Sequence, residues 1–171
     1  MNKNFIKTIL ILLFISLTIP INLTAENNKI DLRNLEGQWE GTGKFLVPMT
    51  NIEMDIEGSA DFKYNEDNDY LRTALVGEKF LFSYSDSGHL AQNQVNDSIY
   101  WEVWDNRGKH AFYKGKVEGN LISGSRLRNK ELYSVNILIK HQDSIDFKLT
   151  VTNPDGDKTD KAVFNLWRVK N

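Results

Sequence analysis

The sequence contains no cysteine and only three prolines and three histidines among its 171 residues. Without cysteine the chain can form no disulfide, no thiolate metal site and no acylated cysteine of the lipoprotein type. Basic residues are not in excess either, because 21 Lys and Arg stand against 23 Asp and Glu. This balance argues against a phosphate-tracking surface, so we expect no nucleic-acid partner. The fold therefore has to be stabilised by packing and backbone pairing alone.

One long hydrophobic run is present, within residues 1–25 (MNKNFIKTILILLFISLTIPINLTA). Lys3 and Lys7 precede the apolar stretch 9–19, and Ala25 stands at a plausible cleavage point. The stretch is shorter than the roughly 20 residues of a membrane-spanning helix. The pattern predicts a secretory signal peptide, with an uncleaved anchor as the alternative. We therefore expect an exported protein, periplasmic or secreted, that is not a lipoprotein and does not span a membrane after cleavage.

The remaining residues, 26–171, have the length of one domain, and they alternate between apolar and polar side chains. In residues 51–64 (NIEMDIEGSADFKY) the positions from Ile52 to Tyr64 carry apolar side chains or glycine at every second place. Residues 144–152 (SIDFKLTVT) repeat this period of two. Such alternation is typical of strands with one apolar face and one polar face. A single helical turn is expected at 30–35.

Short turn signals divide the chain into about ten such strands. The expected ranges are 38–47, 51–64, 69–76, 79–86, 98–105, 109–118, 120–127, 131–140, 144–152 and 160–169. Hairpin-length links place consecutive strands side by side and antiparallel. A meander of this kind leaves two raw edges unless it closes. The sequence thus predicts an all-β fold, an antiparallel meander closed into a single barrel of 8–10 strands over residues 26–171.

Alternation does not by itself say which face points inward. A barrel of the outer-membrane type also alternates, with its apolar face turned to lipid. Here all predicted loops are short, the chain ends in LWRVKN, and acids fill the polar face of the strand at 51–64. These features favour a soluble barrel with its apolar face inside.

The stretch GQWEG at 37–41 and Arg168 near the end of the last strand resemble the lipocalin and calycin barrels. In that superfamily a Gly-x-Trp on the first strand packs its indole against a basic residue of the final strand and shuts the base of the barrel. The resemblance implies that Trp39 and Arg168 form a structural latch here. A guanidinium over an indole contributes about 0.5–2 kcal/mol.

The longer stretch GQWEGTGKF also resembles the first strand of the nitrobindin-type haem barrels, because Gly37, Trp39, Gly41 and Gly43 match Gly-x-Trp-x-Gly-x-Gly. Those barrels hold haem iron through a histidine near the C-terminus, whereas the last histidine here is His141. We therefore expect no cofactor, with haem as the alternative that this resemblance implies.

Catalytic and metal motifs are missing from the sequence. His89, His110 and His141 each stand alone, without a second histidine or a carboxylate at metal-binding spacing. There is no Gly-x-Ser-x-Gly nucleophile motif either. We expect no metal and assign no catalytic residue.

Aromatic and apolar side chains on the inward parity are the candidates for lining a ligand. They are Met54, Phe62, Phe80, Phe82, Tyr84, Trp101, Tyr113, Tyr133 and Phe147. A barrel of this size either fills with such side chains or holds one small ligand, for which hydroxyl groups and the indole N–H supply polar anchors. The sequence favours binding of a small, largely apolar ligand in the barrel. The alternatives are a haem-binding or other enzyme in the barrel mouth, and a structural or protein-binding module of the cell envelope.

Overall fold

The computed structural model describes residues 30–47, 50, 52–80 and 82–170, and the predicted signal peptide at 1–25 lies outside these ranges. A short 3₁₀ helix, η1 (Leu32–Leu35), precedes ten strands. The strands are β1 (Gly37–Leu46), β2 (Glu53–Asn65), β3 (Tyr70–Lys79), β4 (Phe82–Gln92), β5 (Ser98–Asp105), β6 (His110–Glu118), β7 (Leu121–Arg128), β8 (Glu131–His141), β9 (Ser144–Thr152) and β10 (Lys158–Arg168).

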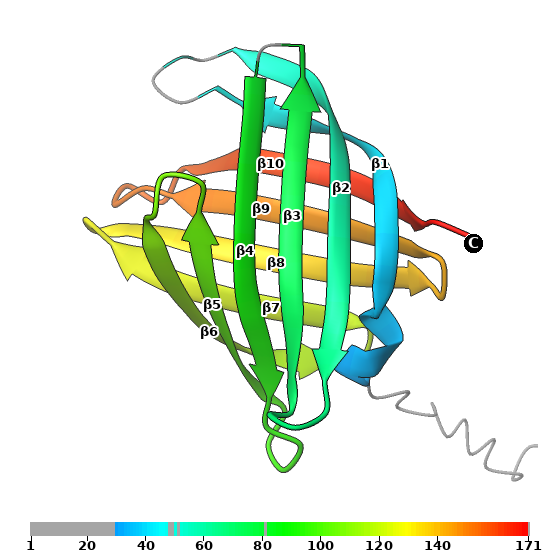
Figure 1. Cartoon of the computed structure of the whole chain (residues 1–171). Helices are drawn as coiled ribbons and strands as arrows, with labels where there is room; N and C mark the ends of the chain where they lie inside the picture. Colours follow the sequence, from blue (N-terminus) through cyan, green and yellow to red (C-terminus); the bar gives the residue numbers. More distant parts are fainter. Residues whose placement is uncertain (1–29, 48–49, 51, 81, 171) are drawn as a thin grey trace, which may run out of the picture.

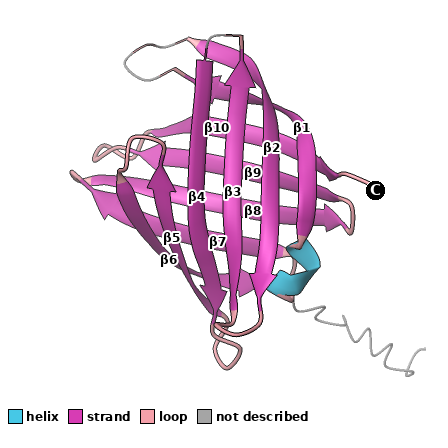
Figure 2. Ribbon diagram, viewed as in Figure 1, coloured by secondary structure: helices cyan, strands magenta, loops and turns pink. Residues whose placement is uncertain are grey.

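The strands form one closed antiparallel barrel in which every strand pairs with its neighbours in sequence and β1 pairs with β10. Figure 1 shows β2, β3 and β4 running upright, with β7 to β10 crossing behind them at a steep angle. Figure 2 shows the helix η1 at the lower end of β1. The predicted all-β meander and its closure into a single barrel are thereby confirmed.

The apolar parity of the strands faces the barrel interior. On β2 the residues Ile56, Gly58, Ala60 and Phe62 are buried, whereas the residues between them are exposed or only partly buried. The alternative considered from the sequence, a barrel of the outer-membrane type with its apolar face outward, is thus not the one observed. Among the described residues no helix is long and apolar enough to cross a membrane.

One end of the barrel, which we call the base, is filled by η1 and by large side chains. Its fully buried members include Leu35, Trp39, Phe62, Leu71, Leu90, Ile99, Ile122, Ile137 and Ile145. The opposite end, which we call the mouth, is bounded by the β5–β6 and β7–β8 hairpins and by the far ends of β1 to β4. The side chains at the base leave little empty space, so the base is a packed hydrophobic core.

Trp39 and Arg168 meet at the base, where β1 and β10 pair residue for residue. The Arg168 guanidinium lies 4.3 Å from the centre of the Trp39 ring, which is the contact that the calycin resemblance implies. Arg168 also donates hydrogen bonds to the carbonyl oxygens of Asn34 (2.6 Å) and Glu36, while the Trp39 indole donates to the carbonyl oxygen of Leu35 at 2.9 Å. The latch therefore joins η1, β1 and β10.

The glycines of the first strand are explained by close approaches inside the barrel. A Cβ atom on Gly41 would lie 1.9 Å from the carbonyl oxygen of Asn165, so any side chain there would clash with β10. A Cβ atom on Gly43 would lie 2.5 Å from the ring of Phe164. Gly58 on β2 makes the same approach to this ring. Glycine at positions 43 and 58 therefore leaves room for the Phe164 side chain in the interior.

The expected strand at 79–86 is wrong in its boundaries. The strand β3 continues through Gly77 to Lys79, and β4 runs from Phe82 to Gln92. The polar composition of 87–92 (SGHLAQ) hid the second half of β4, because serine, glycine and histidine are weak strand signals. The turn between the two strands falls at Phe80, whose φ is +49°.

We expect Arg168→Met to lower the free energy of unfolding by about 2–4 kcal/mol, because it removes hydrogen bonds to carbonyl oxygens as well as the contact with Trp39. Urea denaturation measures the change. Lys170→Met is the control, since Lys170 is 79 % exposed and makes only a surface ion pair with Asp143. Equal stability of Arg168→Met and the wild type would contradict the role of the latch.

Candidate functional site

A polar cluster lies in the mouth half of the interior. Arg126 is two residues from the end of β7, Glu131 begins β8, and Asp86 faces inward from β4, where it pairs with Leu75. Three tyrosines stand beside these charges, and together the cluster is Tyr84, Asp86, Tyr113, Arg126, Glu131 and Tyr133. We call this set the mouth cluster.

The tyrosine hydroxyls donate to the carboxylates of the cluster. The Tyr84 hydroxyl lies 2.8 Å from Asp86 Oδ2, and the Tyr133 hydroxyl lies 3.0 Å from Glu131 Oε2. Burial raises the pKa of Tyr84, Tyr113 and Tyr133, so all three keep their protons at neutral pH. The three hydroxyls therefore remain hydrogen-bond donors, and those of Tyr84 and Tyr133 already donate to Asp86 and Glu131.

The Arg126 guanidinium lies close to two of the tyrosine rings. Its central carbon is 5.0 Å from the centre of the Tyr113 ring and 4.9 Å from that of the Tyr133 ring. Both distances are within the range of cation–π attraction. The Nε atom of Arg126 is buried and has no hydrogen-bond partner, and the same is true of Asp86 Oδ1.

The charge state of Asp86 is set by its surroundings. Desolvation raises the pKa of Asp86 to about 6, against the opposing effect of the hydrogen bond from Tyr84. The nearby carboxylate of Asp105 raises this pKa further, whereas the charges of Arg126 and Arg107 lower it. Asp86 is thus mostly ionised at neutral pH and protonated in mild acid.

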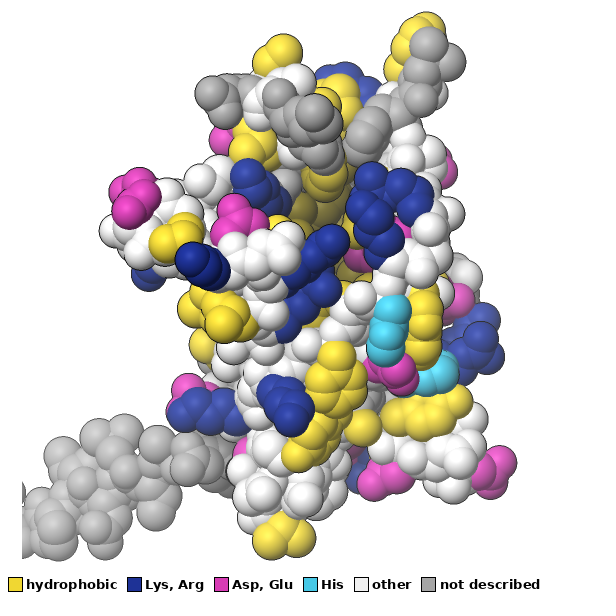
Figure 3. All heavy atoms as spheres, turned by 90° about the vertical axis from the view of Figure 1, so that its left-hand side faces the viewer, with side chains coloured by type: hydrophobic (Ala, Val, Ile, Leu, Met, Phe, Trp, Pro, Cys, Tyr) yellow, Lys and Arg dark blue, Asp and Glu magenta, His cyan; other side chains and the backbone are white. Residues whose placement is uncertain are grey.

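A small apolar cavity borders the mouth cluster. It has a volume of about 40 Å³ and is lined by Gly58, Ser59, Leu75, Val76, Gly77, Phe147, Phe164 and Leu166. Leu75 pairs with Asp86 and Gly77 pairs with Tyr84 across the β3–β4 ladder, so the cavity and the cluster are neighbours. Figure 3 looks onto the side where the β5–β6, β7–β8 and β9–β10 hairpins end, and it shows a hollow with hydrophobic side chains at its bottom and Lys and Arg around it.

The candidates from the sequence are spread over three places. Phe62 and Trp101 are buried toward the base, and the Trp101 indole N–H donates to Thr73 Oγ1 at 3.2 Å, so it is not free to anchor a ligand. Phe147 lies between Trp101 and Phe164, with ring centres 6.4 and 6.2 Å away.

Four of the other six candidates lie toward the mouth. Met54, Tyr84, Tyr113 and Tyr133 are on the inward parity of their strands in that half. The expectation for Phe80 is wrong, because this side chain is 98 % exposed at the β3–β4 turn. The side chain of Phe82 lies outside the described residues.

Asp86, Arg126 and Glu131 were not among the residues expected from the sequence. The sequence does contain a sign of them, because each is a charged residue at a position of its strand where apolar side chains are expected. Each stands two positions from another inward residue, which is Tyr84, Gly124 and Tyr133 respectively. A charge on an apolar face is costly to bury without a partner, which marks such positions for function.

The residues present do not fit a haem group. His89 pairs with Arg72 on the outer face, with its ring centre 4.4 Å from that of Tyr70, and His110 is exposed beside Glu102. His141 is exposed at the end of β8. Within the described ranges no group of three or more His, Asp or Glu could hold a metal ion. Gly43, one of the glycines that match the first strand of the haem barrels, is covered by the Phe164 ring.

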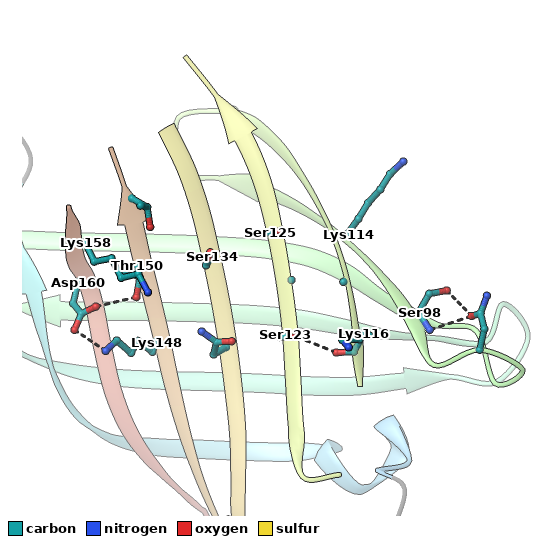
Figure 4. Close-up of a pocket in the computed structure, with 15 residues that line it drawn as sticks. Ser98, Lys114, Lys116, Ser123, Ser125, Ser134, Lys148, Thr150, Lys158 and Asp160 are labelled. Carbon is teal, nitrogen blue, oxygen red and sulfur yellow. Dashed lines mark hydrogen bonds and ion pairs between the residues drawn. The ribbon is translucent and has the colours of Figure 1, made fainter. Parts of the chain in front are cut away.

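A larger hollow of about 1040 Å³ lies on the outer wall over β6 to β10. Among its charged side chains, Lys148 contacts Asp160 at 2.8 Å, and Figure 4 shows Lys114 extending away from the other lining residues. Asp160 also accepts a hydrogen bond from Thr150. This outer groove holds no buried group without a partner, so it is a weaker candidate than the mouth cluster.

No protein-family model matches the sequence, and no curated protein is similar to it. Several solved structures share its fold, and two of them show how far the likeness extends. Rv2717c from M. tuberculosis superposes with a TM-score of 0.61 at 16 % identity, over 81 % of this chain and 95 % of that chain. A protein of unknown function from the DUF3598 family of Nostoc punctiforme gives a TM-score of 0.55 at 9 % identity, over 82 % of this chain.

The chain spans half of the Nostoc protein's length. These similarities and the closed ten-stranded meander fit the calycin-like barrel fold that the sequence resembles, although neither neighbour is named as a lipocalin. At such low identity the likeness concerns the fold alone, and the site has to be argued from its own residues.

We expect Asp86→Asn to change stability in a pH-dependent way. Because the folded-state pKa of Asp86 (about 6) exceeds its ordinary value of 3.8, its contribution to stability is present below pH 4 and is lost as the pH rises through 6. The stability of Asp86→Asn relative to the wild type should therefore grow by roughly 2 kcal/mol between pH 4 and 7.5.

Urea denaturation at the two pH values measures this difference. Asp61→Asn, on the outer face of β2 beside Lys63, is the control, and its effect should stay within about 0.5 kcal/mol at both. A difference for Asp86→Asn that does not vary with pH would show that this carboxyl is not perturbed by burial.

Proposed function

We propose that this protein is an exported binding protein that holds a small, largely apolar ligand in the mouth half of its barrel. The observation that supports this function most strongly is the apolar cavity beside buried polar atoms without partners. Ligand sites commonly combine an apolar lining with a few convergent polar groups. The filled base, in contrast, serves stability.

The size of the cavity limits the ligand. A water molecule needs at least about 10–15 Å³ by this measure, so 40 Å³ accommodates about three non-hydrogen atoms. A short alkyl group therefore enters the cavity, while the rest of the ligand lies among the side chains of the mouth. Export follows from the predicted signal peptide and is part of the proposal, as is the absence of a cofactor.

We expect pentan-2-one, a short ketone with an alkyl tail, to bind with a Kd of about millimolar, as suits a ligand of six non-hydrogen atoms. Saturable NMR shifts of Leu75 and Phe164 measure the binding. Leu75→Phe fills the cavity and should weaken binding at least tenfold. Leu132→Phe, the same change at a side chain 40 % exposed on β8, should leave it unchanged.

Absence of saturable shifts in the wild type, or equal binding by Leu75→Phe, would contradict the proposed function. Thermal unfolding of both variants shows whether each is folded, since extra methylene volume in an interior can cost about 1–3 kcal/mol.

A further inference from the structure

The charges that line the outer groove, the hollow of about 1040 Å³ over β6 to β10, are mostly positive. They are Lys114, Lys116, Lys148, Lys158 and Asp160. This excess departs from the whole chain, in which 23 acidic side chains outnumber 21 basic ones. A hollow over β1 to β3 has the opposite sign, because its described lining holds Asp55, Glu57 and Glu78 with a single lysine. The outer groove is therefore the part of the wall that attracts an anionic ligand.

The register of the strands arranges the polar side chains of this groove in two rows that cross the sheet. Within each row, every member is the direct partner of the next on the neighbouring strand. The first row, from β6 to β10, is Lys114, Ser125, Ser134, Thr150 and Asp160. The second row, from β5 to β9, is Ser98, Lys116, Ser123, Asn136 and Lys148. Because neighbouring strands lie about 4.8 Å apart, each row presents polar groups at this interval over roughly 19 Å.

The middle of the groove is formed by short polar side chains that are free to bind. Ser125, Ser134 and Asn136 have no side-chain hydrogen-bond partner within the part of the chain that the structure describes. Figure 4 shows Ser134 and Ser125 between Lys148 on one side and Lys114 on the other. Hydroxyl and amide groups both donate and accept hydrogen bonds. They therefore suit a ligand that is itself rich in hydroxyl groups.

The cations stand at the two ends of the rows. Lys148 on β9 is three strands away from Lys116 on β6, which is about 14 Å at the usual strand spacing. A ligand with one charge cannot contact both ends, whereas a chain with repeated charges can. Lys114 and Lys158 have no carboxylate partner among the described residues, and the flexible stem of a lysine lets its ammonium group follow a ligand.

We propose that the outer groove binds an extended acidic polysaccharide, with sugar hydroxyl groups on the serine and asparagine side chains and carboxylates on the lysines at both ends. An extended pyranose chain repeats at close to the spacing of the strands, so successive sugars meet successive strands. Single-stranded nucleic acid is also a polyanion, but it binds largely by stacking its bases on aromatic side chains. None of the described residues that line the groove is aromatic, which favours the polysaccharide.

The test compares hexagalacturonate with its fully methyl-esterified form, which keeps the sugar chain and loses the charges. Isothermal titration calorimetry at pH 7.5 in about 50 mM NaCl should show the acid binding at least about tenfold more tightly than the ester. Galacturonate monomer should bind as weakly as the ester, because it reaches only one end of the groove. Raising the salt to about 200 mM NaCl should weaken binding of hexagalacturonate by at least about fivefold.

Two double variants locate the site. Lys114→Glu combined with Lys158→Glu should weaken binding of hexagalacturonate at least about tenfold, because both positions line the groove. Lys109→Glu combined with Lys170→Glu makes the same change in net charge at two exposed lysines elsewhere, and should weaken it less than about twofold. Circular dichroism verifies that both variants are folded, as surface substitutions allow.

Equal affinity for hexagalacturonate and its ester would overturn the proposed recognition of an acidic chain. Equal binding by the two double variants, or no binding of hexagalacturonate at the lower salt, would overturn it as well. Tighter binding of a thymidine oligonucleotide in the same groove would assign it to nucleic acid and contradict the proposal. All of these outcomes concern the outer wall, so they are distinguishable from failure of pentan-2-one to bind inside the barrel.

Discussion

The structure depends on the seam between β1 and β10, because a meander without cysteine has no other means of joining its two ends. Backbone pairing from Trp39 to Phe45 closes the sheet, and the Arg168 side chain ties that seam to the carbonyl oxygens of η1. Closure removes both sheet edges and makes every inward side chain converge on one axis. The interior, and any site within it, exists only because this seam holds.

The interior is divided in a way that follows from side-chain size along the strands. Large aliphatic and aromatic residues fill the base, while glycines at 43, 58 and 77 leave space that the Phe164 ring only partly fills. The remaining cavity adjoins the charged side chains of the mouth cluster, which point inward because of their place in the alternation of each strand. The packed base supplies stability, and it thereby supports a mouth half in which two single atoms, Arg126 Nε and Asp86 Oδ1, have no hydrogen-bond partner.

Much of the fold could be predicted from the sequence, because alternation over long strands such as β2 fixes which face is buried. The hairpin at Phe80 could not, since its turn lacks glycine and the polar stretch after it conceals β4. Of the site, the tyrosines at 84, 113 and 133 followed from parity. The charged members were missed because Asp86 on β4 and Arg126 on β7 lie on strands that do not pair, so their approach is a property of the closed barrel and not of any one strand.

The most direct measurement of the central claim, that the mouth half of the barrel holds a fillable apolar site, is a crystal structure under xenon pressure. Xenon enters dry apolar cavities without needing hydrogen bonds. The account predicts a xenon atom between Leu75, Gly77 and Phe164, with the base unoccupied. Xenon absent from the barrel interior, or bound only on the outer wall, would contradict it.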